Sequence, residues 1–524
     1  AGSGAAVVDA FASLSTVDLK VQDDLTVTDD LIVGGDIDLE GAIDVNGTAN
    51  LDVVDIDGAV DMASTLQVDG AITGSSTING VGISSNITNF SQGILISNDA
   101  GTGTLDGANN NTGLGFEVFD DLTSGDQNTG VGVQALAKVT TGSNNNAFGE
   151  TALYTNTTGG NNVAMGRAAL ESNTTADNNT AIGHQSLKAN STGTTNVAVG
   201  SSALLANTTG TDNVAVGALA LDANTTASQN TAVGRNALTA NTTGHSGIAI
   251  GAYALNANTT GAYNLAIGRD TMVSNTTGTR NSAVGSNSLD ANTTGSHNIA
   301  FGYAALTANT TASYNIAIGD SAMGANTTGT QNIAIGQDAL ATMSTSSYNT
   351  GVGYQALKVN TGQENAAFGT DSLLANTSGG RNTGLGAYSL NANTTANDNT
   401  GVGYLTLYAT TTGVDNTAVG AKALKTATTA TRNTAVGMDS LQACTTGSYN
   451  TGIGQRALYA STTGTENVAM GYLAMDANTT GSYNVGLGVN ALGANTTANY
   501  NTAVGIGAMI ANTTGHSNVA IGAT

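Results

Sequence analysis

The stretch Asn230-Thr-Ala-Val-Gly-Arg-Asn-Ala-Leu-Thr-Ala-Asn-Thr-Thr-Gly-His-Ser246 is one copy of a 17-residue unit that repeats from about Asn111 to the last residue. The glycine at its fifth position returns at Gly251 and closes 25 copies in all, from Gly115 to Gly522. A short fixed period indicates one structural unit stacked many times, in which each unit contacts mainly its neighbours. The sequence therefore predicts a rod rather than several globular domains.

The pattern inside the unit favours β-strands. An Asn lies four residues before the closing glycine in 24 of the 25 copies. Thr, Val, Ile or Leu follows it in most copies, and then come a small residue and an apolar residue. Helix formers at a spacing of 3.6 residues are missing. The chain also contains no Pro, which would remove hydrogen bonds from an internal ladder. We expect an all-β fold, a parallel β-solenoid (β-roll) of about 24 coils and roughly 115 Å in length.

The alternation in each strand predicts which side chains fill the coil. We expect the two apolar positions around the small one, together with the following Leu, to point inward. This assigns to the coil core Val233, Ile250, Ile267, Leu238 and Leu255. The small position, which is Ala or Gly in all 25 copies, should then point outward. Since an exposed position would also admit Ser, Lys or Asp, its strict smallness predicts close packing against another copy of the chain. The predicted oligomer interface is Ala232, Ala249, Ala266, Ala283 and Ala300.

Two columns of Asn run along the repeats. In the first, identical side chains of successive coils can form an amide ladder, as stacked strands do elsewhere; it includes Asn213, Asn230, Asn264 and Asn281. The second column, which includes Asn241, forms an Asn-x-Thr sequon. Glycans on every coil would be only about 5 Å apart. The preference of Asn and Thr for turns therefore explains this column better than glycosylation does.

The chain divides into three segments: residues 1–17, a cap, anchor or inserted strand; residues 18–110, an acidic shaft of short β-strands; and residues 111–524, the solenoid. In the shaft, alternating apolar and acidic runs at residues 24–28, 36–40, 52–57 and 65–69 predict strands separated by turns. Asp36, Asp38 and Glu40 share one strand face, so they are either a Ca²⁺ site or a solvated acidic face. No loop has Ca²⁺-binding spacing, which favours the solvated face. We expect no other cofactor.

The charge and the scarcity of residues with catalytic or ligand-binding side chains argue against several classes of function. The formal net charge of −24 argues against a nucleic-acid partner. No run of 18 apolar residues exists, so we expect no membrane insertion. The residues Ala1 to Leu14 lack the basic start of an intact signal peptide. The four His and the scattered acids have no recurring partners, which predicts that the protein is not an enzyme. The one Cys, Cys444, is either a small buried residue or a contact between chains.

Tyrosines occupy some of the variable positions. Tyr263, Tyr314, Tyr449 and Tyr483 each lie just before the first Asn of a repeat. Exposed aromatic side chains suit glycan or protein contacts. The alternative is that they cover the seam between coils or between chains.

The residues Asn298-Ile-Ala-Phe-Gly302 and Asn332-Ile-Ala-Ile-Gly336 resemble the head repeats of trimeric autotransporter adhesins. The resemblance covers residues 111–524 and implies a left-handed parallel β-roll that associates as a homotrimer and binds host surfaces. The repeat of that family is usually shorter than 17 residues, so the cross-section of the coil can differ.

The longer repeat, preceded by short Gly/Asp-punctuated strands, also resembles tail-fibre proteins of phages and other viruses. Those proteins often carry a C-terminal self-cleaving chaperone domain. Because residues 521–524 end within a repeat, we expect that domain to have been removed or the sequence to be incomplete.

The sequence therefore predicts an extracellular homotrimeric fibre, a tail fibre or surface adhesin on a virion or cell, that presents a long rod to a cell-surface glycan or protein receptor. The alternative is a self-assembling extracellular filament subunit with a purely structural role, joined end to end. A remote alternative is an ice-binding solenoid, prompted by the regular Thr columns such as Thr242 and Thr243.

Overall fold

The computed structural model describes residues 26–27, 30, 32–33, 77–78, 81–87, 90–97 and 104–524. The described residues form strands and turns and contain no helix. The strands are β1 Thr77–Ile78, β2 Val81–Ile87, β3 Phe90–Ser97, β4 Thr112–Leu114, β5 Thr129–Val131, β6 Asn146–Phe148, β7 Val163–Met165, β8 Thr180–Ile182, β9 Val197–Val199, β10 Val214–Val216, β11 Thr231–Val233, β12 Ile248–Ile250, β13 Leu265–Ile267, β14 Ser282–Val284, β15 Ile299–Phe301, β16 Ile316–Ile318, β17 Ile333–Ile335, β18 Thr350–Val352, β19 Ala366–Phe368, β20 Thr383–Leu385, β21 Thr400–Val402, β22 Thr417–Val419, β23 Thr434–Val436, β24 Thr451–Ile453, β25 Val468–Met470, β26 Val485–Leu487, β27 Thr502–Val504 and β28 Val519–Ile521.

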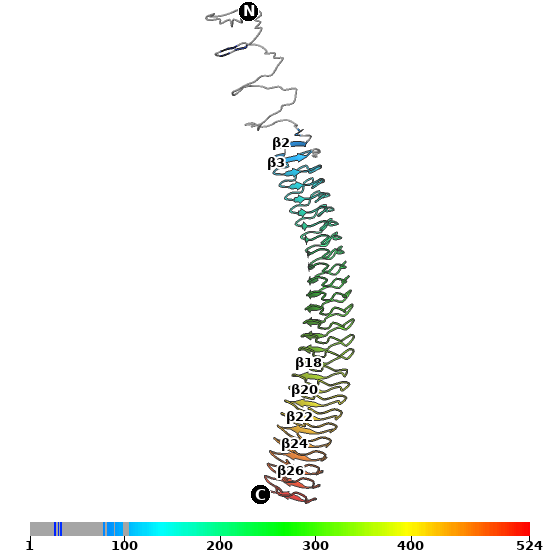
Figure 1. Ribbon diagram of the computed structural model, residues 1–524, viewed down its shortest axis with the longest axis vertical. Coiled ribbons are helices and arrows are strands. Elements are labelled where there is room, and N and C mark those ends of the chain that lie inside the picture. The colour runs from blue at the N-terminus through cyan, green and yellow to red at the C-terminus, as the bar shows by residue number, and fades with distance from the viewer. Residues whose placement is uncertain are drawn as a thin grey trace, which may run out of the picture. The chain divides into compact units, whose positions relative to one another are not determined.

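The predicted parallel β-solenoid is confirmed. Each strand from β4 to β28 pairs in parallel with the next, and these strands stack along one side of the coils (Figure 1). The register repeats the sequence period, because Ala232 pairs with Ala249 and Ala249 with Ala266. One coil is a residue shorter, and there Thr350 pairs with Ala366. The missing residue lies in a turn, so the strand ladder continues without interruption.

The ladder begins before the first full repeat. Strands β1, β2 and β3 pair antiparallel, and β3 then pairs in parallel with β4, with Ile94 opposite Thr112. These strands lie within the segment predicted as a shaft. The strands predicted at residues 36–40, 52–57 and 65–69, most of residues 24–28 and the segment 1–17 lie outside the described residues. The Ca²⁺ candidates Asp36, Asp38 and Glu40 also lie outside them.

The closing glycine is required by both backbone conformation and space. Gly251 has φ +134°, a region that side-chain-bearing residues rarely adopt. A Cβ at Gly251 would lie 2.4 Å from the carbonyl oxygen of Gly268 in the next coil. Any other residue would therefore push neighbouring coils apart.

The predicted assignment of inward and outward side chains was wrong for the strand residues. The small residues Ala232, Ala249, Ala266, Ala283 and Ala300 are fully buried inside the coil. Ile250 is 39% exposed, and Val233 and Ile267 are also on the outer face, at intermediate exposure. The predicted core residues Leu238 and Leu255 are buried as expected. The period of two was right, but the strand presents the opposite face to the interior.

The cause is the narrow interior of the coil. Leu side chains from the opposite wall fill it and leave room for a single methyl group or less on the strand. At Gly384, for example, a Cβ would lie 3.5 Å from Leu373 Cδ1 and 2.6 Å from Ser372 Oγ. The strict smallness of this column therefore comes from packing inside one chain and does not indicate an interface.

In three coils a buried Ser and the small strand residue 12 positions later lie against each other. Where the small strand residue is Gly384, Gly401 or Gly452, the position 12 residues earlier is Ser372, Ser389 or Ser440. Each Ser hydroxyl donates to the carbonyl oxygen of its glycine, at 3.0, 3.0 and 2.9 Å. At these coils the Ser hydroxyl lies 2.6–2.7 Å from where a Cβ on the glycine would be. At Ser288 the hydroxyl instead donates to Ala300 O at 2.8 Å, so a different placement of the hydroxyl accommodates Ala.

The first Asn column forms the predicted amide ladder. Asn213 Nδ2 donates to Ala227 O at 2.9 Å, and Asn213 Oδ1 accepts from the backbone N–H of Asn230 at 3.0 Å. Asn264 Oδ1 accepts from the N–H of Asn281 in the same way, at 3.0 Å. These side chains are buried, so each one satisfies the backbone groups of a turn that water cannot reach.

The second Asn column is also buried. Asn241 Nδ2 donates to Gly244 O at 2.9 Å and to Asn224 Oδ1 at 3.0 Å. Because the sequon nitrogen is buried and bonded, the folded coil does not present it for glycosylation. At one of the lapses in this column Cys444 donates its thiol to Gly447 O at 3.3 Å, and burial raises its pKa to about 12. Cys444 is therefore a small buried residue of the coil.

The Ser–Gly coupling predicts a double-mutant effect. Gly401→Ala should destabilise its coils by about 1–3 kcal/mol, because the new methyl group collides with Ser389 Oγ, 2.6 Å away. Adding Ser389→Ala should recover most of that loss, since the combination Ala203 with Ala215 occurs in a normal coil. Hydrogen–deuterium exchange across residues 384–418 measures this local stability. Equal protection in Gly401→Ala and in the parent chain would contradict the proposed packing.

Candidate functional site: an exposed apolar stripe

The outer face of the strand ladder is apolar along its whole length. Because the middle residue of each strand points inward, the first and third point outward. The third residue is Val, Ile, Leu, Phe or Met in every strand from β4 to β28. Many of these side chains are well exposed, for example Phe148 at 39%, Ile250 at 39% and Leu385 at 48%. We call this column of third residues the apolar stripe.

The first residues of the strands widen the stripe in some places and not in others. In β15, β16 and β17 the first residue is Ile299, Ile316 or Ile333. From β20 to β24 it is Thr in every strand. The apolar face is therefore two residues wide near the middle of the solenoid and one residue wide further on. Thr remains compatible with a β-strand, so the ladder itself does not change.

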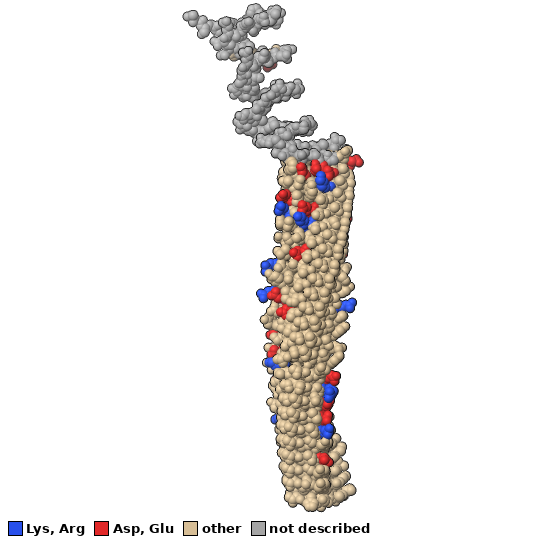
Figure 2. Space-filling view, turned by 90° about the vertical axis from the view of Figure 1, so that its right-hand side faces the viewer, with Lys and Arg blue, Asp and Glu red and all other residues tan. Residues whose placement is uncertain are grey.

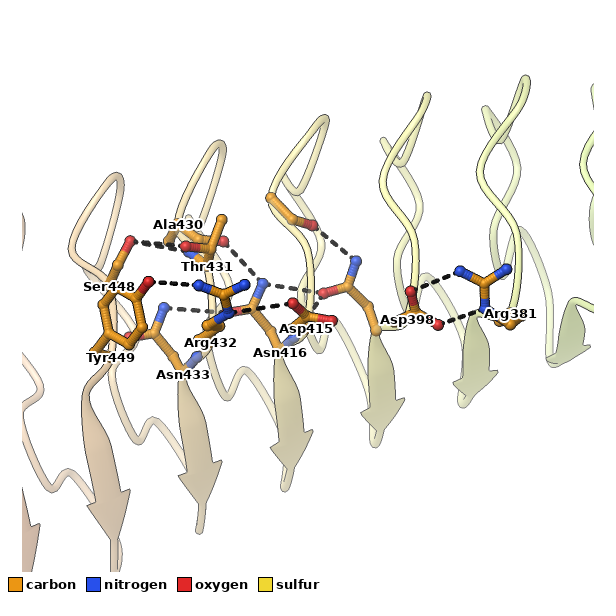
Figure 3. A network of polar contacts seen from close by, with 12 residues as sticks. Arg381, Asp398, Asp415, Asn416, Ala430, Thr431, Arg432, Asn433, Ser448 and Tyr449 are labelled. Atoms are coloured by element: carbon orange, nitrogen blue, oxygen red, sulfur yellow. Dashed lines mark hydrogen bonds and ion pairs between the residues drawn. The ribbon is translucent and has the colours of Figure 1, made fainter.

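Few charges lie on the solenoid surface. Figure 2 shows them in small groups separated by long uncharged stretches on the face in view. Several groups are ladders between successive coils. Arg381 donates two hydrogen bonds to the carboxylate of Asp398, at 2.7 and 2.9 Å, and Arg432 lies 3.4 Å from Asp415 (Figure 3). The bonds from Arg381 lower the pKa of Asp398. Because these pairs are exposed, they contribute little stability.

The four tyrosines predicted as recognition residues lie in one exposed column beside the strands. Tyr263, Tyr314, Tyr449 and Tyr483 are 52%, 58%, 50% and 45% exposed. Several ring faces are already occupied by a residue of a neighbouring coil. The ring of Tyr314 stacks on His297 with a centroid distance of 4.9 Å, and Arg280 lies 5.8 Å from the ring centroid of Tyr263.

The stacking direction limits what these tyrosines can bind. Successive coils are about 4.8 Å apart, so rings stacked at this spacing have their faces along the rod. Their edges and hydroxyls then point to solvent. Tyr449 uses its hydroxyl to accept a hydrogen bond from Arg432 (Figure 3). The seam between coils thus accounts for much of this column, and contact with a receptor stays a prediction.

No candidate metal site is found in the part of the chain that the structure describes. There, no three His, Cys, Asp or Glu side chains lie close enough together to hold a metal ion. His245 and His297 contact the neighbouring tyrosines Tyr263 and Tyr314 through their rings. Among the described residues no helix has the length and hydropathy needed to cross a membrane.

One feature of the sequence pattern indicates that the stripe is exposed: the first and third strand positions differ in how strictly they are apolar. The third strand position is apolar in every copy, whereas the first position accepts Thr, Ser and Asn, as in Asn146 and Ser282. Two columns on the same inner face should have been equally intolerant of polar residues. Their inequality indicates that neither column lies in the coil interior.

A few acidic side chains are partly buried between coils, and Asp222 makes a pH-dependent prediction. Burial raises its pKa above the ordinary value of 3.8, against hydrogen bonds from the backbone N–H groups of Ala223 and Asp222. The folded state therefore binds this proton more tightly than the unfolded state. The resulting stabilisation is complete below pH 3.8 and is lost as the pH rises through the raised pKa. Asp222→Asn should thus stabilise the solenoid at neutral pH, and its advantage should shrink in acid.

Hydrogen exchange or thermal unfolding of Asp222→Asn, measured at neutral pH and again in acid below pH 3.8, checks this expectation. Asp212→Asn is the matched control, because Asp212 is an exposed acid in the same coil. A destabilised Asp222→Asn variant at neutral pH would show that the carboxylate makes a favourable contact that outweighs its burial.

Comparison of the whole chain with protein-family models and with curated proteins found no match in either set.

Proposed function

We propose that this protein is an extracellular fibre whose chains associate as a homotrimer along the apolar stripe, and that the resulting rod serves attachment to a surface. The stripe is the observation that supports this proposal. Monomeric proteins rarely expose a continuous apolar patch of more than a few hundred Å². Here every coil adds one large apolar side chain to the same face. Such a surface is typical of an interface.

The energetics favour association. Burying an aliphatic side chain completely contributes about 1.5–3 kcal/mol, so covering the two-fifths of Ile250 that is exposed would contribute roughly 0.6–1.2 kcal/mol. Summed over all strands of the ladder, the free energy gained by covering these side chains exceeds the approximately 4–15 kcal/mol that association costs in lost translational and rotational freedom. A single coil would gain too little, so the interface depends on the length of the rod.

The sheet type supports a partner on this face. Purely parallel sheets occur almost only where both faces are covered. The inner face of this ladder is covered by the Leu column, whose members, such as Leu238, are buried. The outer face carries no other part of the described chain. A second and third copy of the same chain, presenting the same stripe towards a common axis, would cover it.

The number of chains comes from the resemblance to trimeric adhesin repeats and tail fibres. A closed ring around an axis along the rod buries all the stripes together and leaves no open interface, as closed symmetry requires. The ridges of turns would then form the outer surface of the fibre. Attachment would use these ridges, the tyrosine column or parts of the fibre outside the described residues.

The structure offers little support for an ice-binding surface. Thr242 Oγ1 donates to Thr259 O of the next coil at 3.1 Å, so this Thr column is engaged in holding the coils together. Thr243 is exposed and follows it directly in a turn. Only the Thr243 column therefore exposes its hydroxyls, whereas an ice-binding surface would need a flat face with two such columns. A structural filament joined end to end stays as the stronger alternative.

Charges placed on the stripe should separate the chains without unfolding the coils. In the triple variant Ile250→Asp, Ile318→Asp and Val402→Asp, each carboxylate would face its copies in a buried layer, which is strongly unfavourable. Sedimentation equilibrium should give a trimer for the parent chain and a monomer for this variant, with an unchanged β circular-dichroism spectrum. The matched control is Thr243→Asp, Thr311→Asp and Thr395→Asp on the exposed turn ridge, which should remain trimeric.

A parent chain that stays monomeric at micromolar concentration with its coils intact would contradict the self-association. A stable dimer or tetramer would keep the stripe as the interface but contradict the trimer.

Electron microscopy of the native source tests the role of the rod. We expect separate fibres that project from a virion or cell surface and bear this chain by antibody labelling. A continuous polymer of repeating subunits would favour the structural filament, and labelling confined to the cell interior would contradict an extracellular fibre.

A further inference from the structure

Two neighbouring tyrosines in the exposed column are held ring against ring. Tyr483 and Tyr500 occupy equivalent positions in successive coils, and their ring centroids are 4.9 Å apart with an interplanar angle of 8°. The rings are 45% and 59% exposed, so a small oxidant can reach both. We propose that this pair is a site of oxidative coupling, at which the two rings form an intrachain dityrosine cross-link.

The backbone around the pair keeps the two rings in register. Each tyrosine is followed directly by a member of the buried amide ladder, and Asn484 Oδ1 accepts from the N–H of Asn501 at 3.0 Å. The strands that follow are paired with Val485 opposite Thr502. The N–H of Tyr483 donates to Thr465 O at 3.0 Å, and that of Tyr500 to Ser482 O at 3.2 Å. The coil stack thus places the two tyrosines at equivalent positions of neighbouring coils, where their rings stack.

The other tyrosines of this column lack such a partner within the described solenoid. The coil after Tyr449 carries Glu466, Tyr348 lies between Gln331 and Glu364, and Tyr314 stacks on a histidine. One other tyrosine pair, Tyr388 and Tyr404, is in contact, but its centroids are 6.2 Å apart and its rings meet edge to face at 79°. Of the two tyrosine pairs, the parallel one therefore has the closer rings and stacks them face to face.

The chemistry is a two-electron oxidation. Each phenol loses one electron and its hydroxyl proton, which gives two phenoxyl radicals with spin density on the ortho carbons. A bond forms between one ortho carbon of each ring, and each of these carbons passes its hydrogen to a ring oxygen as aromaticity returns. The net loss is one hydrogen atom from each tyrosine. Hydrogen peroxide, acting through a peroxidase, accepts both and becomes two molecules of water. The product is a covalent bridge between two coils.

The experiment treats the purified full chain with a peroxidase and hydrogen peroxide. We expect dityrosine fluorescence, and digestion should give a cross-linked peptide pair that joins Tyr483 to Tyr500 and is lighter than the sum of its parts by two hydrogen atoms. The oxidised chain should keep the mobility of a single chain on a denaturing gel, because the bridge is intrachain. Tyr483→Phe and Tyr500→Phe should each lose this peptide pair while keeping the stacked rings and the fold. Tyr449→Phe, which removes an equally exposed tyrosine, should keep it.

Three results would overturn the proposal. One is a dominant product between Tyr483 residues of different chains, visible as cross-linked dimers on the gel. Another is survival of most of the dityrosine in Tyr500→Phe. The third is a set of cross-links spread over all exposed tyrosines, as expected for the same chain oxidised in urea. The intrachain peptide pair and its loss in the two Phe variants are expected for a single chain and for a trimer alike, so the test is separate from that of the proposed function.

Discussion

The width of the coil interior controls most of this structure. A Leu from one wall meets a three-residue strand on the other, and the space between them holds one methyl group. This constraint restricts the middle strand position to Ala or Gly, as in Ala249. At buried pairs such as Ser389 and Gly401, the Ser hydroxyl lies 2.6 Å from where a Cβ on the glycine would be. The larger apolar side chains of the strand have no room inside and must face outward.

Buried amides hold the turns of the narrow coil together, in addition to the packing of its apolar side chains. The Asn columns connect successive turns through side-chain bonds such as those of Asn213 and Asn241, so polar groups that would otherwise be costly to bury are paired along most of the stack. The column tolerates some lapses. At Thr410 and Ser461 the hydroxyls have no hydrogen-bond partner within the described chain, and Asn393 Oδ1 is left without a donor.

The outward placement of the Val and Ile side chains changes how self-association would work. A small outward column would have implied close backbone contact between chains. The observed stripe would instead bury large side chains between them, as in an ordinary hydrophobic core shared by several subunits. The narrow coil and the proposed fibre then have one cause, since the apolar surface that cannot enter the coil is available to a partner. The ion-pair ladders of Arg381 and Arg432 lie at the edge of this face, where solvent screens them.

The sequence alone determined the period, the position of each strand, the parallel register and the existence of the amide ladder, because these follow from identical residues recurring at a constant spacing. It also identified Leu238 and Leu255 as core residues. It could not determine which face of the strand points inward. The pattern in Ile248, Ala249 and Ile250 satisfies a period of two in either orientation, and the usual rule that large apolar residues are buried selects the wrong one. Only the opposite wall of the coil decides the matter. The tertiary structure also determines the backbone conformation of Leu238, whose φ of +53° is uncommon for a residue with a side chain. In this conformation the Leu238 side chain is buried in the coil interior.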